Sequence, residues 1–459
     1  MAKIKIEKKY IFRTICTVIL AILVTVMFFY VWLRFVRVNN QTGSLMGYGN
    51  LSMAAGIYII LYVLFGRWLK AFRIGIDRKA NLLASEVMTL FILNIVEIFV
   101  SCAITGQFRF FPDFLWRYFL LFLVQSLITC VLINYMVNLY RHIFPPYKIL
   151  EVYRYADDHK LHFMNERPDK YHISEVICID EGLDKIFTAM DDYDAVLIND
   201  IPSEIKNDIL KECFNRGKRV YFTPKISDII GKNSEDINLF DTPLYLCRNN
   251  GIQASQLIIK RICDCLISAI GLIITSPVFL VVAIMIKAED HGPVFYRQKR
   301  TTIGGREFEM LKFRSMIVDA EKDGRPCPAG EADDRITKVG RRIRPVRIDE
   351  LPQLINILRG DMSVVGPRPE RVEHVKKYTE EIPEFVYRLK VKGGLTGPAQ
   401  VFGRYNTDAL NKLKMDLAYI TNYSLLLDLQ ILFETVKILA QKESTKGFSE
   451  EKREEMHDA

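Results

Sequence analysis

Two common cysteine patterns are missing from this chain of 459 residues. Its nine cysteines are scattered, and no two of them form a Cys-x-x-Cys pair. Closely paired cysteines are typical of zinc sites, and a dense, ordered set is typical of a disulfide framework in a small secreted domain. We therefore interpret these cysteines as reduced thiols of a cytosolic or membrane protein, with a packing role.

A glycine-rich phosphate loop is also missing. The first candidate strand of the middle region, "KILEVY", continues into "RYADDHK" without the Gly-x-Gly-x-x-Gly that opens many dinucleotide sites. Short apolar runs, "VICI", "AVLIN" and "RVYF", alternate with helix-like stretches. This alternation predicts a parallel, Rossmann-like α/β domain. We expect its role to be regulatory or structural, with cofactor binding as the minority interpretation.

Charge is scarce in the first third of the chain. A charge-free run of 19 residues from Ile15 to Leu33 is long enough to cross a bilayer. No small-residue cleavage site follows it, so an anchor is favoured over a signal peptide. Three further apolar segments follow, near 51–66, 81–105 and 115–139. Basic residues at the N-terminus and after the second and fourth segments place both ends of this four-helix unit in the cytosol.

The third of these segments carries Glu86, Asn94 and Glu97. Buried charges in a membrane protein face the protein interior, where they mark a transport path or pack helices together. Packing is the favoured interpretation.

A fifth apolar segment, Cys265 to Ile286, is charge-free over 22 residues. Ser276 and Pro277 stand in its middle, where proline kinks or breaks a helix. Both flanks are basic, so the positive-inside rule places both in the cytosol. We expect a re-entrant helix that bends at Ser276-Pro277, with a spanning helix as the alternative.

The net charge of +8 suits nucleic acid, anionic lipid or a phosphorylated substrate. The basic residues gather in the C-terminal third, which contains "RIDELPQLINILRGDMSVVGPRPE". Apolar positions in "LPQLINIL" predict a short helix that ends at Gly360, with Asp349 at its N-cap. A cap alone would explain Asp349, with Glu350 as a partner of the helix dipole.

Five nearby arginines favour a phosphate-handling site instead. They are Arg344, Arg347, Arg359, Arg368 and Arg371. Aspartate can act as a nucleophile toward phosphorus, and acids beside phosphate indicate Mg²⁺, for which Asp349 and Glu350 are the candidate ligands. Pro367 and Pro369 fix the backbone on either side of Arg368 and hold its guanidinium in place.

Several motifs in this region occur in one characteristic order. They are "GPVFYRQKR", "FEMLKFRSM", "RITKVG", "RIDELPQLINILRGDMSVVGPRPE", "GGLTGPAQV" and "YITNYSLLLDLQILFETV". Over roughly 255–440 the chain resembles the bacterial sugar transferases, the monotopic phosphoglycosyl transferases that initiate exopolysaccharide, capsule or O-antigen synthesis. The upstream helices and α/β domain resemble the long form of this family.

The resemblance implies transfer of sugar-1-phosphate from a UDP-sugar to undecaprenyl phosphate, with release of UMP. Asp349 would form a covalent phosphosugar intermediate, and Glu350 would help to position the groups and Mg²⁺. The resemblance also implies a multi-pass protein of the bacterial cytoplasmic membrane, with its catalytic domain on the cytoplasmic face. The residues we assign to substrate binding are Arg297, Lys312, Arg314, Arg344, Arg359, Pro367, Arg368 and Pro369.

The expected fold class is a membrane protein, α plus α/β. Its expected parts are a four-helix transmembrane bundle at 1–145, the Rossmann-like α/β domain at 146–250, the re-entrant membrane helix at 251–290, a mainly helical α/β catalytic domain at 291–441 and a charged tail at 442–459. We expect no nucleic-acid partner, and a homodimer or contacts with polysaccharide assembly proteins stay open. The alternatives are a non-catalytic membrane scaffold or regulator and a transporter built on the first four helices. The identity of the sugar is not predicted.

Overall fold

The structure is a computed structural model, and it describes residues 2–39, 48–155, 164–239, 241–247, 251–318, 320, 333–403 and 407–439. These residues belong to two compact units, one that ends at Thr223 and one that begins at Pro224. The charged tail expected at 442–459 lies outside the described residues.

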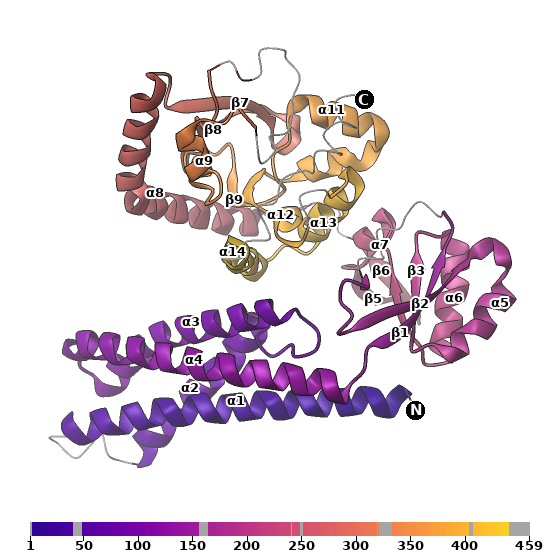
Figure 1. The fold of residues 1–459 in the computed structure, drawn as a ribbon, viewed down its shortest axis with the longest axis horizontal. Helices are drawn as coiled ribbons and strands as arrows, with labels where there is room; N and C mark the ends of the chain where they lie inside the picture. Colours follow the sequence, from indigo (N-terminus) through magenta and orange to yellow (C-terminus); the bar gives the residue numbers. More distant parts are fainter. Residues whose placement is uncertain are drawn as a thin grey trace. The chain divides into compact units, whose positions relative to one another are not determined.

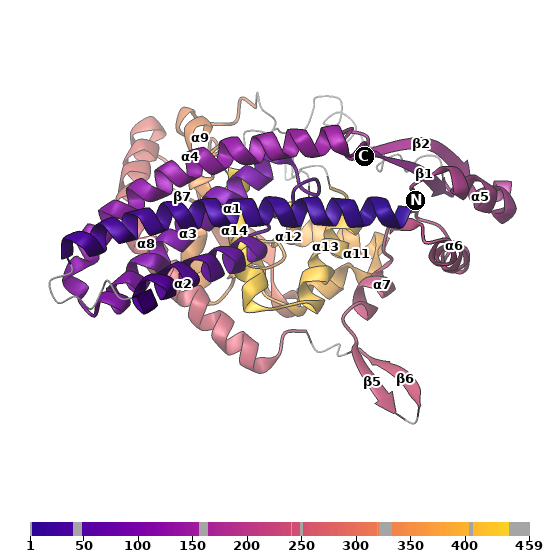
Figure 2. The same cartoon turned by 90° about the horizontal axis from the view of Figure 1, so that it is seen from below.

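Four long helices open the first unit (Figure 1). They are α1 (Ala2–Asn39), α2 (Tyr48–Trp68), α3 (Lys79–Thr105) and α4 (Phe111–Ile143). By length and composition each can cross a membrane, as the sequence predicted. Aromatic side chains are the largest members of their shared core, in which the rings of Phe28 and Tyr58 stack with centroids 4.1 Å apart. Figure 2 shows α1 running beside α4 and α2.

The three polar residues predicted in the third segment lie inside this bundle. Glu86, Asn94 and Glu97 are all buried. The Tyr62 hydroxyl donates to Glu86 at 2.8 Å, and the Asn94 amide donates to Gln125 at 3.0 Å. These contacts join α3 to α2 and α4, in agreement with helix packing.

The α/β part of the first unit is a four-stranded sheet. Its strands are β1 (Tyr147–Tyr153), β2 (Tyr171–Cys178), β3 (Ala195–Asn199) and β4 (Arg219–Phe222), in the spatial order β2-β1-β3-β4. All neighbouring strands are parallel, as the alternation of strands and helices predicted. The connecting helices α5 (Leu183–Ala189) and α6 (Ser203–Asn215) pack on one apolar face through Ile186 and Ile209. The eight cysteines that the structure describes are all free.

The second unit begins with a short helix, α7 (Ile226–Gly231), and an antiparallel hairpin, β5 (Glu235–Leu239) with β6 (Thr242–Leu246), which Figure 2 shows as a separate ribbon. Next come α8 (Ala254–Asp290) and a second antiparallel pair, β7 (Phe295–Thr301) with β8 (Glu307–Phe313). The remaining elements are α9 (Lys338–Ile343), α10 (Gln353–Arg359), β9 (Ser363–Val365), α11 (Val372–Glu381), β10 (Gly394–Thr396), α12 (Pro398–Phe402), α13 (Ala409–Thr421) and α14 (Leu425–Leu439). Strands β9 and β10 pair in parallel.

Helix α8 bends sharply along its length (Figure 1). Its first part contacts α10, where Gly271 lies against Leu354. Its second part, from Val278 onward, packs against β8 and α9 in a cluster that includes Phe313 and Val339. The packing partners therefore change between Gly271 and Val278, on either side of the Ser276-Pro277 pair that the sequence analysis singled out.

Pro277 lies inside α8 and has no N–H to donate to the carbonyl of Ile273, four residues earlier. The Ser276 hydroxyl donates to that carbonyl at 2.8 Å. The hydroxyl of the preceding residue, Thr275, donates to the Gly271 carbonyl at 2.7 Å. The Ser276 hydroxyl thus satisfies the Ile273 carbonyl, which Pro277 leaves without its usual backbone donor.

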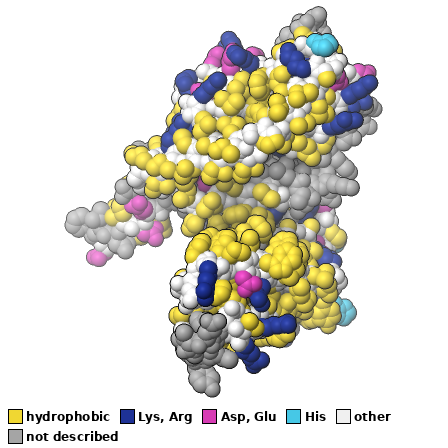
Figure 3. All heavy atoms as spheres, turned by 90° about the vertical axis from the view of Figure 1, so that its left-hand side faces the viewer, with side chains coloured by type: hydrophobic (Ala, Val, Ile, Leu, Met, Phe, Trp, Pro, Cys, Tyr) yellow, Lys and Arg dark blue, Asp and Glu magenta, His cyan; other side chains and the backbone are white. Residues whose placement is uncertain are grey.

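The outer surface of α8 is strongly apolar. Large side chains are exposed along both of its parts, among them Ile258, Ile262, Leu266, Ile270, Ile274, Leu280 and Ile284. Figure 3 shows a broad apolar surface on this side, with Lys and Arg side chains at its edges. An apolar patch of this size marks an interaction surface, and its composition suits lipid.

Candidate active site

The two adjacent acids lie in a single 3-10 turn, Ile348–Glu350, directly before α10. The turn is preceded by Arg347, whose φ of 54° is left-handed. The N-cap of α10 is Pro352, and no side chain caps this helix. The prediction that Asp349 caps the helix is therefore wrong, because the extra turn moves Asp349 three residues ahead of the cap. The predicted stop is confirmed: Gly360, at φ 91°, ends α10.

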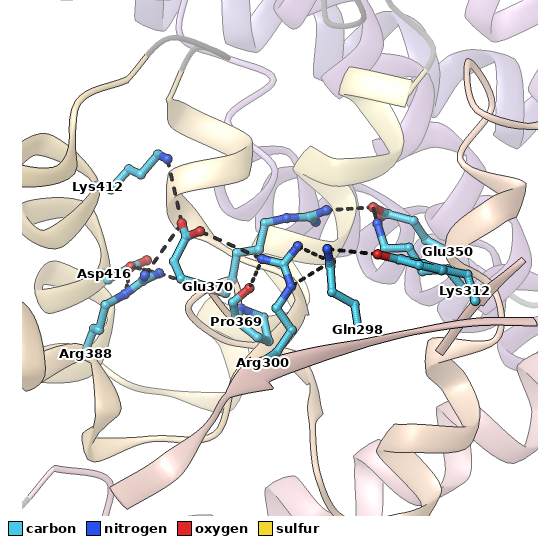
Figure 4. A network of polar contacts seen from close by, with 11 residues as sticks. Gln298, Arg300, Lys312, Glu350, Pro369, Glu370, Arg388, Lys412 and Asp416 are labelled. Carbon is cyan, nitrogen blue, oxygen red and sulfur yellow. Dashed lines mark hydrogen bonds and ion pairs between the residues drawn. The ribbon is translucent and has the colours of Figure 1, made fainter. Parts of the chain in front are cut away.

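Glu350 is held by cations from two separate elements. Its Oε1 accepts from Arg368 at 2.7 Å and from Lys312, on β8, at 3.2 Å. Arg347 lies 4.0 Å from the other oxygen. Figure 4 shows Lys312 and Glu350 meeting at one end of a chain of charged side chains. Glu350 is thus oriented by the protein itself.

Asp349 is buried but differently placed. None of the described residues makes a hydrogen bond or ion pair with its carboxylate. Burial raises the pKa of Asp349 above that of an ordinary aspartate, and the charge of Lys312 opposes this rise. Within the described residues, the result is a basic carboxylate without a polar partner beside a carboxylate that is fixed by cations.

Burial disfavours the ionised form of Glu350 too, but the charges of Arg368 and Lys312 outweigh it and hold the pKa of Glu350 well below its usual range. Burial lowers the pKa of Lys312, although the charge of Glu350 opposes that shift. The Glu350 charge raises the pKa of Arg368. The two neighbouring acids therefore have opposite pKa shifts, which is typical of paired carboxylates with different roles.

Arg368 projects from a tight turn that follows β9. The turn passes very close to the start of β10: a Cβ on Gly394 would lie 2.2 Å from the backbone nitrogen of Gly366. The Gly366 amide donates to the Thr396 carbonyl at 2.9 Å. Glycine is required at this approach because any side chain would push the two backbones apart. The segment "GGLTGPAQV", one of the motifs quoted above, thus packs against the backbone of the Arg368 turn.

Helix α8 and helix α14 hold β9 from the other side. Asp264 of α8 accepts from the Val364 amide at 2.9 Å. Lys260, one turn earlier, is 2.6 Å from Asp428 of α14, which also accepts from the Tyr419 hydroxyl at 2.7 Å. All these groups are buried. The apolar helix is therefore connected through polar contacts to the strand that leads into the Arg368 turn.

The structure brings only some of the predicted binding residues to the acids. Arg344 ends α9 and lowers the pKa of Asp349 through its charge. Arg314 is buried in a bidentate ion pair with Asp290, at the end of α8. Arg297 on β7 pairs with Glu309 at 3.2 Å. Arg359 is exposed at the far end of α10 from the acids. Their roles in substrate binding stay predictions.

A charged network behind the Arg368 turn was missed by the sequence analysis (Figure 4). It contains Arg300 on β7, Glu370 after the turn, Arg388, and Lys412 and Asp416 on α13. These residues span more than a hundred positions of the sequence, so no local spacing relates them. The only indication of this network in the sequence was that the region contains more arginines than the Asp349–Glu350 pair (the dyad) needs.

The same region tests the expected magnesium site. Among the described residues, no group of three or more His, Cys, Asp or Glu side chains is placed to hold a metal ion. Glu350 already has cationic partners, whereas none of the described residues pairs with the Asp349 oxygens. A Mg²⁺ ion here would thus need substrate oxygens to complete its coordination, which is how Mg²⁺ binds in many phosphate sites.

Comparison with known proteins relates the sequence of this chain to a family. Residues 255–442 match the model of the family described as bacterial sugar transferase. A UDP-glucose:undecaprenyl-phosphate glucose-1-phosphate transferase of Caulobacter vibrioides is 42% identical over 186 residues, which cover 39% of this chain and 69% of the relative. The chain belongs to the bacterial sugar transferase family.

Other members of the bacterial sugar transferase family are similar over different lengths. A putative undecaprenyl-phosphate N-acetylgalactosaminyl 1-phosphate transferase of Bacillus subtilis is 48% identical over 136 residues, 30% of this chain and 75% of the relative. A UDP-glucose:undecaprenyl-phosphate glucose-1-phosphate transferase of Klebsiella pneumoniae is 39% identical over 267 residues, 55% of this chain. That match covers 54% of the Klebsiella protein, so the chain spans about half the length of that relative.

Proposed function

We propose that this protein transfers sugar-1-phosphate from a UDP-sugar to undecaprenyl phosphate and releases UMP. The product would initiate an exopolysaccharide, capsule or O-antigen. The observation that carries the proposal is the contrast within the dyad: Glu350 is held by Arg368 and Lys312, whereas the buried carboxylate of the adjacent Asp349 has no hydrogen-bond or ion-pair partner among the described residues. The activities named for the family relatives support the same reaction class.

The chemistry follows as two displacements at one phosphorus. An Asp349 oxygen attacks the phosphorus next to the sugar, and the bond from that phosphorus to the bridging oxygen breaks. UMP leaves with the electron pair, and the phosphosugar is held as an acyl phosphate. An oxygen of undecaprenyl phosphate then attacks the same phosphorus, the bond to Asp349 breaks, and the free carboxylate returns.

Cationic side chains suit the charge that gathers in both steps. Lys312 and Arg368 lie beside the dyad, and Arg344 is close enough to affect Asp349 electrostatically. They would balance negative charge on the phosphates. Asp349 and, once released from a cation, Glu350 would hold Mg²⁺ together with donor oxygens. The ion would supply further charge neutralisation on the diphosphate.

The membrane location is part of the proposal. Helix α8 would enter the cytoplasmic leaflet of the bacterial inner membrane, bend near Ser276-Pro277 and return. Both of its parts contact the catalytic unit, and its outer side is apolar. A soluble donor and a lipid acceptor would then meet at the membrane surface.

The activity is tested by measuring UMP release in membranes. Wild type and Asp349→Asn are offered a panel of UDP-sugars with undecaprenyl phosphate, with and without Mg²⁺. We expect UMP with one donor, loss of at least about 10³-fold in the variant, and a phosphosugar adduct on Asp349 by mass spectrometry when the acceptor is omitted. Folded wild type that releases no nucleotide from any nucleotide sugar would favour the scaffold alternative.

The topology needs a separate experiment. Single cysteines at Gln253 and His291, the residues that flank α8, are exposed to a membrane-impermeant maleimide in right-side-out and inverted vesicles. A re-entrant helix gives labelling of both positions from the cytoplasmic side only. Labelling from opposite sides would establish a spanning helix instead.

A further inference from the structure

The backbone of the Arg368 turn is held by two guanidinium groups, that of the buried Arg388 and that of the partly buried Arg300. Arg388, from the 3-10 segment Pro383–Lys390, donates to the Arg368 carbonyl at 2.9 Å. Arg300, from β7, donates to the next carbonyl, that of Pro369, at 3.1 Å. Consecutive carbonyls are thus fixed by residues from elements that precede and follow the turn in sequence.

Arg388 is in turn oriented by Asp416. The Arg388 side chain is 3% exposed and that of Asp416 is fully buried. The Oδ2 atom of Asp416 accepts from Nε of Arg388 at 3.0 Å and lies 2.8 Å from a terminal nitrogen, so two guanidinium nitrogens meet one carboxylate oxygen. The guanidinium also lies over the Phe385 ring, 4.9 Å from its centroid. Such planar, multiple contacts need arginine, because lysine offers a single compact charge.

Glu370 connects the two arginines. One of its carboxylate oxygens is 3.7 Å from Arg388 and from Lys412, and the other is 4.0 Å from Arg300. The positive charges of these three residues outweigh burial and lower the pKa of Glu370. Figure 4 shows the resulting row of charges, which runs from Asp416 through Glu370 and Arg300 toward Glu350.

The network is connected to the dyad through Arg368. Arg368 is the residue whose carbonyl Arg388 fixes and whose guanidinium reaches Glu350 at 2.7 Å. A shift of the turn would therefore move the group that orients Glu350. Buried ion pairs add little net stability compared with apolar packing, so a pair aimed at a backbone carbonyl suits positioning better than support of the fold.

We propose that Arg388, oriented by Asp416, is a positioning residue that fixes the Arg368 turn and through it the ion pair between Arg368 and Glu350. The expected effect on kcat rests on the proposed transferase function. The expected effect on the order of the turn rests on the contacts alone. Neither Arg388 nor Asp416 touches the dyad.

The test compares Arg388→Lys and Asp416→Asn with wild type by two readouts in the full-length protein. Hydrogen exchange is followed in peptides that cover 363–371, and UMP release is measured at varied donor concentration. We expect faster exchange confined to 363–371, kcat lower by about 10²-fold and little change in KM. Arg335→Lys is the matched control, since Arg335 pairs with Asp333 away from the turn; it should change neither readout.

A double-mutant cycle separates positioning from general support. In an Arg368→Ala background, Arg388→Lys should cause little further loss of kcat, because the group it positions is already gone. Full additivity, or faster exchange throughout the second unit, would show a merely structural role and overturn the inference. Wild-type exchange in 363–371 for both variants would also overturn it. If wild type itself released no UMP, the proposed function would fail, and the exchange data would still decide whether Arg388 holds the turn.

Discussion

Glu350 and Arg368, eighteen positions apart in sequence, meet at 2.7 Å, and Lys312 donates to the same carboxylate oxygen at 3.2 Å. This relationship separates two acids that sequence alone presents as equivalent. The fixed Glu350 cannot easily attack a substrate, because its oxygens are engaged by cations. The adjacent Asp349 has no hydrogen-bond or ion-pair partner in the part of the chain that the structure describes, and its pKa is raised, which suits a nucleophile.

Neutralising the fixed acid should impair catalysis without removing the nucleophile. Glu350→Gln leaves Lys312 and Arg368 without their anionic partner and frees both to shift. We expect UMP release to slow by about 10²- to 10³-fold, while a phosphosugar adduct on Asp349 still forms slowly. Glu307→Gln, an exposed change on β8, is the control. A wild-type rate in Glu350→Gln would contradict the role assigned to the ion pair.

The pH dependence of UMP release should report the ionisation of Asp349. In the proposed mechanism only the ionised form of Asp349 would attack. Its pKa is raised, so the rate of UMP release should begin to fall at a higher pH than the pKa of an ordinary aspartate, about 3.9. Glu350 behaves oppositely: its contribution to stability is present above about pH 4.3 and is lost as pH falls through its depressed pKa. The acid limb of the rate should therefore appear while the protein is still folded.

Rates of UMP release and thermal melting, both measured across pH, check this order. Lys312→Met should move the acid limb to higher pH, because the Lys312 charge lowers the pKa of Asp349. A limb that coincides with unfolding, or that does not move in the variant, would contradict the assignment.

The close approach of two turns predicts a stability effect at glycine. In Gly394→Ala the new Cβ would meet the Gly366 nitrogen at 2.2 Å and the Thr396 carbonyl at 2.5 Å, so backbone must move. We expect a loss of roughly 1–3 kcal/mol and a lower melting temperature, with slower UMP release. Gly231→Ala, where a Cβ meets no atom within 4 Å, is the matched control. Equal melting temperatures for the two variants would show that the two turns can move apart without loss of folding stability.

The ion pair between α8 and α14 predicts a larger loss of folding stability than the glycine contact does. Asp428→Ala leaves Lys260 buried without its partner, which costs about 3–5 kcal/mol. Lys260→Met combined with Asp428→Leu should recover most of that loss, because no buried charge is then unpaired. Melting in detergent measures both, with exposed Glu380→Ala as control. If the double variant melts no higher than Asp428→Ala, the penalty does not arise from the unpaired lysine.

The elements that could be predicted from sequence are those with a local cause. Uninterrupted apolar runs identified the long helices, alternation identified the parallel sheet, and Gly360 ended α10 where expected. Asp349 was wrongly placed at a helix cap, because sequence periodicity does not register an extra 3-10 turn.

The candidate site was harder to predict in its distances than in its residue types. Lys312 and Arg368 reach Glu350, but the equally basic Arg297 and Arg359 do not, since charge gives no information on which face of an element it occupies. The pairs Arg388–Asp416 and Lys260–Asp428 join segments 28 and 168 positions apart. Such contacts arise only when the chain has folded.

The hold on the Arg368 turn is made on main-chain oxygens. Every amino acid supplies that oxygen, so the hold itself places no demand on the side chain at either position. The side chain of Arg368 is thus constrained by its proposed chemical role, and that of Pro369 by the backbone angle it fixes. Arg388 and Arg300, which donate to their carbonyls, are constrained instead by hydrogen-bond geometry. Over evolutionary time the side chain at position 368, which is proposed to face the substrate, could change without a change in the arginines that position its backbone.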